Sequence, residues 1–343
     1  MAYISFQPSD YFNTMLYTGN SSVRTLTGVG FQPDFVWIKD RSNASRNHMI
    51  FDSLRGATKH IHSNDTDAEA TLADSLTAFT SDGFSLGTDS TAGSALVNGN
   101  ANSYVSWNWK MGTTSGLSGG TITPSAYSIS ATTGSALLKY TGTGSVGTIP
   151  HGLGKEPSMI IVKRTDTTSQ WSVYFKDLGN GYHIPLDTAD SPVDSANYWN
   201  DTSPTSSVFT VGTGTDVNAS GGTYIAMVFA NIKGFSQSGT YNGNNGQNFI
   251  YTGFKPSWLL MRRWGGAQWI VVDNKRGYNG SNELLYTDSD EASGSAEVVD
   301  LVSNGFCQRS SGAGNNQNTV DYFYMAFAAE PLVSSNNIPA TAR

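Results

Sequence analysis

The sequence has little charge, one cysteine and no long apolar run. Charged residues make up 14% of the 343 residues, and the net charge is −7 without a basic cluster, so a surface for nucleic acid is not expected. The single cysteine, Cys307, excludes an internal disulfide framework. No apolar stretch approaches the ~20 residues of a membrane span, and the first residues lack a signal-peptide pattern. We therefore expect a soluble protein made in a cytoplasm, with no membrane partner.

Motifs of common enzyme classes are also scarce. The chain contains no H-E-x-x-H and no P-loop pattern. Aspartates are plentiful in the predicted loops, but nothing selects the pair of carboxylates, ~5–10 Å apart, that glycoside hydrolysis requires. We expect no catalytic residues and no enzymatic activity.

Turn formers and aromatic residues dominate what is present. Glycine contributes 37 residues, and Trp, Tyr and Phe together reach 12%, whereas Glu, Lys and Leu are scarce. This composition is typical of an all-β protein with many loops. So many large apolar side chains can bury a core, which argues against disorder.

One phrase occurs three times in the chain. A glycine, a proline and four consecutive apolar residues appear as GFQPDFVWIK from Gly30, as GLGKEPSMIIVK from Gly152 and as GFKPSWLLMR from Gly253. Proline cannot donate to a sheet ladder, so it is expected where a strand begins. A continuous apolar run predicts a strand buried on both faces. The Lys or Arg that follows is predicted to mark the exit of the strand into solvent.

A second phrase closes each repeat, as YVSWNWK, YIAMVFA and YFYMAFA. Large apolar residues alternate in it, which predicts a half-buried strand, with Trp107, Met227 and Met325 at one equivalent buried position. Self-similarity over this length indicates duplicated domains rather than a solenoid. We predict an all-β fold of three tandem β-sandwich-like repeat domains, with long Gly-, Asn- and Ser-rich loops. Short helices are expected only near 67–76 and 290–302.

The predicted boundaries follow from these anchors. Residues 1–112 form an N-terminal docking arm and the first repeat, residues 113–235 a linker and the second repeat, residues 236–332 the third repeat, and residues 333–343 a C-terminal tail. The Gly/Ser/Thr-rich stretch from Gly112 to Ser130 is typical of a linker or a long loop. We expect the three domains to pack against one another.

The first repeat contains the phrases GVGFQPDFVWIKDRS, IFDSLRGATKHIHSNDTDAEA, FTSDGFSLG and VSWNWKMG. These resemble a domain common in proteins of tailed phages of aquatic bacteria, including cyanophages and pelagiphages. The phrase IPHGLGKEP, Ile149–Pro157, also resembles one that is frequent in phage fibre proteins. The second and third repeats match more loosely, and the second lacks the FD…RGA stretch. The resemblance supplies no active site.

The resemblance implies a structural protein of the virion. The leading hypothesis is a tail-fibre or receptor-binding protein that contacts a glycan or protein of the host surface and is carried by other virion proteins. The alternative is a capsid or tail decoration protein without a receptor role. A glycan-degrading tailspike-type enzyme is the third hypothesis. A homo-oligomer is expected, with a trimer favoured.

Aromatic residues in polar, Gly-rich stretches are the best pointer to a binding surface. Flat rings beside guanidinium groups suit carbohydrate and acidic polymers. The alternative is that these rings fold back over the sheet edges. The candidate binding residues are Tyr198, Trp199, Arg262, Trp264, Trp269, Arg276 and Tyr278.

Two sets of residues raise the question of a metal. His60 and His62 share one face of a predicted strand and, with Asp65 or Asp67, could ligate a cation, although a hydrogen-bonded strand face explains them as well. Acidic positions also recur near Asp65, Asp187 and Asp288. Oxygen-rich loops can bind calcium, and Asx turns explain the same residues. We predict no cofactor and leave calcium open.

Overall fold

The computed structural model describes residues 5–91, 96–112, 116–277 and 279–331 and shows an all-β protein. Its sheets are built from antiparallel strand pairs. The helical elements are single turns: η1 (Pro8–Asp10), η2 (Lys176–Leu178), α1 (Ala196–Trp199) and α2 (Thr215–Asn218). Among the described residues, no helix is long and apolar enough to cross a membrane.

The segments predicted to be helical, 67–76 and 290–302, contain short strands instead. These are β6 (Ala70–Thr71), the start of β7 (Leu76–Thr80), β24 (Gly294–Ala296) and β25 (Val299–Val302). A helix of about ten residues is marginal by itself, so pairing with neighbouring strands decides the conformation.

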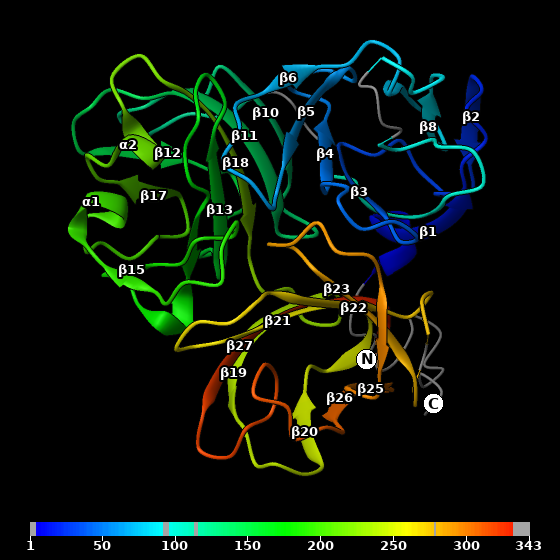
Figure 1. The fold of residues 1–343 in the computed structure, drawn as a ribbon. Coiled ribbons are helices and arrows are strands. Elements are labelled where there is room, and N and C mark those ends of the chain that lie inside the picture. Colours follow the sequence, from blue (N-terminus) through cyan, green and yellow to red (C-terminus); the bar gives the residue numbers. More distant parts are fainter. Residues whose placement is uncertain (1–4, 92–95, 113–115, 278, 332–343) are drawn as a thin grey trace.

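The strands fall into three units of the same design (Figure 1). Unit 1 (residues 12–109) contains β1 (Phe12–Thr18), β2 (Arg24–Thr27), β3 (Phe35–Asp40), β4 (Met49–Asp52), β5 (Lys59–His62), β6, β7, β8 (Gly83–Leu86) and β9 (Ser103–Trp109). Unit 2 (126–229) contains β10 (Ala126–Ser130), β11 (Ser135–Thr141), β12 (Gly147–Pro150), β13 (Met159–Arg164), β14 (Ser172–Phe175), β15 (Tyr182–His183), β16 (Val193–Asp194), β17 (Val208–Val211) and β18 (Thr223–Phe229). Unit 3 (236–331) contains β19 (Ser236–Asn242), β20 (Asn248–Tyr251), β21 (Phe254–Arg263), β22 (Ile270–Asp273), β23 (Asn282–Tyr286), β24, β25, β26 (Gly305–Gln308) and β27 (Asp321–Pro331).

Each unit has one large sheet and a small sheet, and unit 2 also contains the two-stranded sheet β15-β16. The large sheets have the orders β1-β9-β3-β4-β5-β6, β10-β11-β18-β13-β14 and β19-β27-β21-β22-β23-β24. The small sheets are β2-β8-β7, β12-β17 and β20-β26-β25. In every unit the last strand (β9, β18 or β27) lies between the proline-led strand and one earlier strand (β1, β11 or β19), so the sequence repeat is also a repeat of topology. The domain boundaries predicted from the sequence stay a prediction.

The three prolines occupy equivalent places. Pro33 and Pro157 lie two residues before β3 and β13, and Pro256 lies at a register shift in β21. The residues two positions after them form the equivalent pairs Phe35–Trp109, Met159–Phe229 and Trp258–Phe327. The prediction that a strand begins at each proline therefore holds approximately for Pro33 and Pro157. It is wrong for Pro256, which is the third residue of β21 and pairs with Ala328.

A stacked pair of tyrosines lies in each unit at the end of the large sheet opposite the proline. The pairs Tyr17–Tyr104, Tyr140–Tyr224 and Tyr241–Tyr322 have ring centroids 4.9–5.1 Å apart. A glycine two residues after the first tyrosine lets a loop come close: a Cβ on Gly142 would lie 2.4 Å from Ala219 O. The repeated Tyr-x-Gly phrase is therefore a packing motif.

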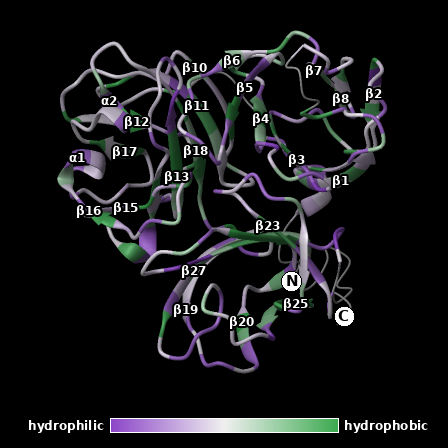
Figure 2. Ribbon diagram, viewed as in Figure 1, coloured by the Kyte–Doolittle hydropathy of each residue, from purple (hydrophilic) through white to green (hydrophobic). Residues whose placement is uncertain are grey.

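The largest apolar core lies between the three large sheets. It combines residues of all three units, whereas three smaller cores fill the individual sandwiches. Figure 2 shows hydrophobic residues along strands such as β11, β13 and β18, with more polar loops outside. Trp107, Met227 and Met325 are at most 2% exposed and all belong to the central core, as predicted. The strands carrying them are buried on both faces, so the half-buried prediction is wrong, because the sandwich interior covers the second face.

Candidate binding surface

Each unit binds a neighbouring unit through a ring nitrogen. The contacts are His48 Nε2 to Tyr286 O (3.0 Å), Trp171 Nε1 to His62 O (2.7 Å) and Trp269 Nε1 to Pro185 O (2.9 Å). Because Trp37 Nε1 donates to His48 Nδ1 (2.8 Å), the proton of His48 is on Nε2, which donates to the carbonyl. Unit 1 thus contacts unit 3, unit 2 contacts unit 1, and unit 3 contacts unit 2. We call each of these contacts between two units a joint, and the three joints form a closed ring.

The cation at the end of each central strand also belongs to a joint. Lys39, Lys163 and Arg262 are 0% exposed, so the prediction that they mark an exit into solvent is wrong. Lys39 Nζ donates to Asp290 O (3.3 Å), Lys163 Nζ to Thr66 O (2.9 Å) and Arg262 Nη1 to Pro185 O (2.6 Å). Burial lowers the pKa of both lysines to about 8 and that of Arg262 to about 10. The neighbouring unit covers each strand end.

Replacing Asp187 by asparagine is expected to stabilise the protein by about 1–2 kcal/mol near pH 7.5. Asp187 accepts a hydrogen bond from Trp171 N (3.2 Å), and burial raises its pKa to about 6. The pKa of Asp187 is higher in the folded protein than in the unfolded chain, so the protonated carboxyl favours folding. This contribution to stability is fully present below about pH 4 and is lost as the pH rises through the folded pKa of about 6. Unit 1 has Asn64 at the equivalent position, where it accepts from His48 N (2.8 Å). The new amide N–H groups offset part of the gain.

Thermal melts near pH 7.5 and near pH 4.5 measure this effect. The higher melting temperature of Asp187→Asn relative to wild type is expected to disappear at the lower pH. Variant and wild type are compared at the same pH, so the titration of the histidines affects both equally. Asn64→Asp is the matched control and is expected to destabilise near neutral pH. A lower melting temperature for Asp187→Asn near pH 7.5 would contradict the argument.

Four of the predicted binding residues are not on the surface. Trp199, Arg262, Trp269 and Arg276 are at most 1% exposed. Arg262 and Trp269 form the joint between units 3 and 2, Arg276 pairs with the buried Asp273 (2.6 Å), and Trp199 belongs to the core of unit 2. The prediction that they are exposed is wrong, because the same Gly-rich sequence can lie in a solvent-exposed loop or at a joint between two units.

The other predicted residues have separate positions. Trp264 is half-buried, with its ring 5.2 Å from that of Phe323. Tyr198 is half-buried, stacks on His183 and lines a pocket of ≈340 Å³ that also contains Asp216. Tyr278 lies outside the described residues. A binding role for Tyr198 or Trp264 stays a prediction.

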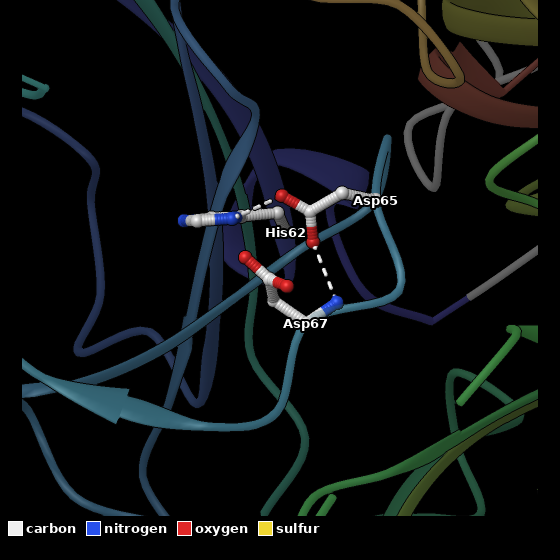
Figure 3. A group of neighbouring side chains, drawn as sticks. All are labelled: His62, Asp65 and Asp67. Carbon is white, nitrogen blue, oxygen red and sulfur yellow. Dashed lines mark hydrogen bonds and ion pairs between the residues drawn. The ribbon is translucent and has the colours of Figure 1, made fainter. Parts of the chain in front are cut away.

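A histidine and two aspartates gather in the loop after β5. His62, Asp65 and Asp67 offer ligand atoms within 4.8 Å of one another, and no other such group occurs in the part of the chain that the structure describes (Figure 3). His62 Nδ1 lies 2.6 Å from Asp65 Oδ2. Burial acts to raise the pKa of Asp65, but the hydrogen bond with His62 contributes to a net lowering. The set offers nitrogen and oxygen ligands suited to a divalent cation.

The same loop has a structural explanation. Lys163 of unit 2 donates to Thr66 O between the two aspartates, and Asn47 Nδ2 donates to Asp65 Oδ2 (2.8 Å). Carboxylates beside a buried ammonium group offset its cost of desolvation. His60, the other predicted ligand, is 5% exposed, and burial lowers its pKa to about 4. The joint between units 1 and 2 accounts for these side chains, and a metal here stays the alternative interpretation.

The three acidic positions considered for calcium serve different contacts. Asp187 and Asp288 accept backbone N–H groups from Trp171 (3.2 Å) and Trp269 (3.0 Å), and burial raises the pKa of both carboxyls to about 6. They fix the chain before β14 and β22. Asp65 lies in the His62 cluster instead. Calcium binding stays the open alternative to these structural roles.

One short match to an enzyme motif has a structural role. Residues 83–87 read GFSLG, the G-x-S-x-G pattern of nucleophilic serines, which requires a sharp strand-to-helix turn. Ser85 lies within β8 and shares a hydrogen bond with the Thr25 hydroxyl (2.8 Å). It is a strand residue rather than a nucleophile elbow.

Two aromatic side chains that the sequence analysis missed project from unit 3. Phe249 and Tyr251 are 51% and 55% exposed, whereas Ile250 between them is 8% exposed and belongs to the core of unit 3. Side chains alternate along a strand, so the two rings share the outer face, about 6.8 Å apart along β20. In the part of the chain that the structure describes, β20 pairs with one strand of its sheet, β26.

The adjacent strands extend this surface with polar groups. Phe249 of β20 pairs with Cys307 of β26, and Cys307 pairs in turn with Asp300 of β25. Arg309 Nε donates to Asp300 Oδ2 (2.7 Å). We call Phe249, Tyr251, Cys307 and Arg309 the aromatic face.

The equivalent strands of the other units have different residues. Register equates the pair Phe249–Tyr251 with Thr25–Thr27 in unit 1 and Thr148–Pro150 in unit 2. The fold therefore does not require aromatic rings here. Two rings that expose apolar surface to water at neighbouring positions form a candidate binding surface. The letters NFIY, from Asn248, carried a signal: aromatic residues alternate with an apolar residue just before the third GF-x-P phrase.

A family model described as Domain of unknown function (DUF7483) matches residues 7–331. The chain belongs to this family. The DUF7483 match covers all three units, in agreement with the central core that they share. No curated protein matches the chain.

Proposed function

We propose that this protein is a non-enzymatic component of a phage virion that attaches the particle to a polysaccharide of the host surface. The observation that carries the proposal is the aromatic face, where Phe249 and Tyr251 are half-exposed at positions that unit 1 fills with threonine. The phage setting is supported by the resemblance of the first-repeat phrases to phage proteins. A tail-fibre or receptor-binding role is the form of attachment that we favour.

The chemistry of the aromatic face suits a sugar chain. Aromatic rings provide flat apolar surfaces for the C–H faces of sugars at a low cost in conformational entropy. Arg309 directly follows β26, the neighbour of β20, and its guanidinium has N–H groups beyond those bonded to Asp300 for hydroxyl groups. Two rings spaced along one strand favour a polymer over a single small molecule.

The test is binding of the full chain to an array of bacterial surface polysaccharides. The double variant Phe249→Thr/Tyr251→Thr installs the residues of unit 1 and is expected to bind at least about tenfold more weakly. Its melting temperature is expected to change little, since Phe249 and Tyr251 are 51% and 55% exposed. Val193→Thr, which alters a 47% exposed residue of unit 2, is the matched control and should bind like wild type.

Two outcomes would contradict the proposal. The first is a double variant that binds polysaccharide as tightly as wild type. The second is a wild-type protein that binds no polysaccharide but assembles on purified tail or capsid proteins, which would favour the decoration role.

A further inference from the structure

A polar pocket lies at the seam between units 1 and 3 and shares no residue with the aromatic face. Its volume is ≈400 Å³, within the range of small-molecule sites. One wall comes from β1 and the residues before it, and the other from β21, the turn after β22 and the end of β27. The turn η1 contacts both β1 and β27, so the two walls are held together. We call this the seam pocket.

An irregularity in the sheet opens the seam pocket. The pairing of β21 with β27 shifts between Lys255 and Pro256 and again between Pro256 and Trp258. Ser257 and Ala329 therefore have no partner in the register of β21 with β27, and both line the pocket. Bulges of this kind re-aim side chains and are frequent beside binding sites.

The equivalent position in unit 1 is filled by its own side chains. Ser53 N donates to Asp34 O there, as Asn274 N donates to Ser257 O in unit 3. The Asp34 carboxylate accepts from Ser53 Oγ (3.0 Å) and from Met111 N (2.8 Å). In unit 3, by contrast, Asn274 Oδ1 is buried and has no hydrogen-bond partner among the described residues.

The wall of the seam pocket combines one cation with uncharged polar groups. Of the described residues that line it, Lys275 is the charged one, and it is exposed. Thr14 is 5% exposed, and its Oγ1 has no partner in the described part of the chain. A buried polar group without a partner is unfavourable, because it has lost its hydrogen bonds to water. A ligand that carries an anion and several hydroxyl groups would satisfy all three side chains.

We propose that the seam pocket binds the carboxylate-bearing sugar unit of an acidic polysaccharide, an inference that takes its ligand class from the proposed function. Lys275 binds the carboxylate, while Thr14 Oγ1 and Asn274 Oδ1 hydrogen-bond with ring hydroxyl groups. In a protein with a net charge of −7, a pocket whose described lining has a lysine and no carboxylate selects for an anion.

The test is NMR titration of the ¹⁵N-labelled full chain with glucuronate, and with glucose as the uncharged matched probe. Glucuronate is expected to shift the side-chain amide signals of Asn13 and Asn274, which line the pocket, and glucose to bind at least about tenfold more weakly. Lys275→Gln is expected to weaken glucuronate binding at least about tenfold, and Thr14→Val about threefold. Lys275 is exposed, so its variant should keep the wild-type melting temperature.

Either of two results would overturn this inference: no shift at these amides with glucuronate up to about 50 mM, or equal affinity of wild type and Lys275→Gln. The variant Phe249→Thr/Tyr251→Thr separates the two proposals, since it should retain glucuronate binding at the seam pocket. If that variant also retains full polysaccharide binding, the role of the aromatic face is contradicted while the seam pocket stands. If wild type binds polysaccharide through the aromatic face but glucuronate leaves the seam unchanged, only the seam pocket is excluded.

Discussion

Replacing Asp273 by alanine is expected to lower the free energy of unfolding by about 3–5 kcal/mol. Asp273 and Arg276 form a salt bridge (2.6 Å) between fully buried side chains. The guanidinium lies 5.3 Å from the centre of the Trp107 ring of unit 1, and Trp107 Nε1 donates to Asp273 Oδ2 (2.9 Å). Alanine would leave an unpaired buried charge and an unpaired indole N–H at the contact between units 1 and 3.

Asp52→Ala is the matched control in unit 1. Asp52 and Arg55 form the same i,i+3 salt bridge, but Arg55 has a second carboxylate, Glu69, at 3.5 Å. We expect a loss at least about 1 kcal/mol smaller for Asp52→Ala. Urea unfolding of both variants measures the difference. Equal losses, or a loss below about 1 kcal/mol for Asp273→Ala, would show that the buried pair does not anchor this contact.

The repeated strands could be predicted because their determinants are local. A proline without an N–H group cannot sit within a regular central ladder, and Pro33, Pro157 and Pro256 accordingly precede paired segments or sit at a register shift. The alternation around Trp107 and Met227 correctly gave the face that enters the central core. The opposite face was misjudged, because one sequence does not show how many layers will pack on a strand.

The joints could not be predicted, since each depends on a contact between distant repeats. Trp269 Nε1 meets a carbonyl 84 residues away, and His48 Nε2 meets one 238 residues away. A tryptophan in a Gly-rich stretch fits either a joint or a binding loop. The pair Phe249 and Tyr251 was equally ambiguous, because three consecutive apolar residues predict a strand buried on both faces, and only the fold places Ile250 inside and the two rings outside.

The ring of joints bears on the predicted homotrimer. Three units of one chain already enclose an apolar core, the arrangement that three identical subunits would form in a closed trimer. The surface that would join three such subunits is thus buried within the chain. A trimer of whole chains stays a prediction, and it would have to use the outer surfaces of the units.

Phe229→Ala is expected to lower the free energy of unfolding by about 3–5 kcal/mol, the range for a buried phenylalanine. Phe229 is 5% exposed in the central core, with its ring 5.5 Å from that of Phe327 in unit 3. It lines a void of ≈20 Å³ that is enclosed by residues of all three units. Loss of the ring would enlarge this void between sheets that cannot close on it, so a cavity cost adds to the lost burial.

Phe249→Ala makes the same chemical change at a half-exposed ring and is expected to cost less than about 1 kcal/mol. Because the central core belongs to all three units, urea unfolding of Phe229→Ala should remain one cooperative transition, shifted as a whole. The measurement needs both fluorescence and far-UV circular dichroism, which should give coincident curves. Two separate transitions, only one of them moved by Phe229→Ala, would mean that the units unfold independently and that the central core does not join them.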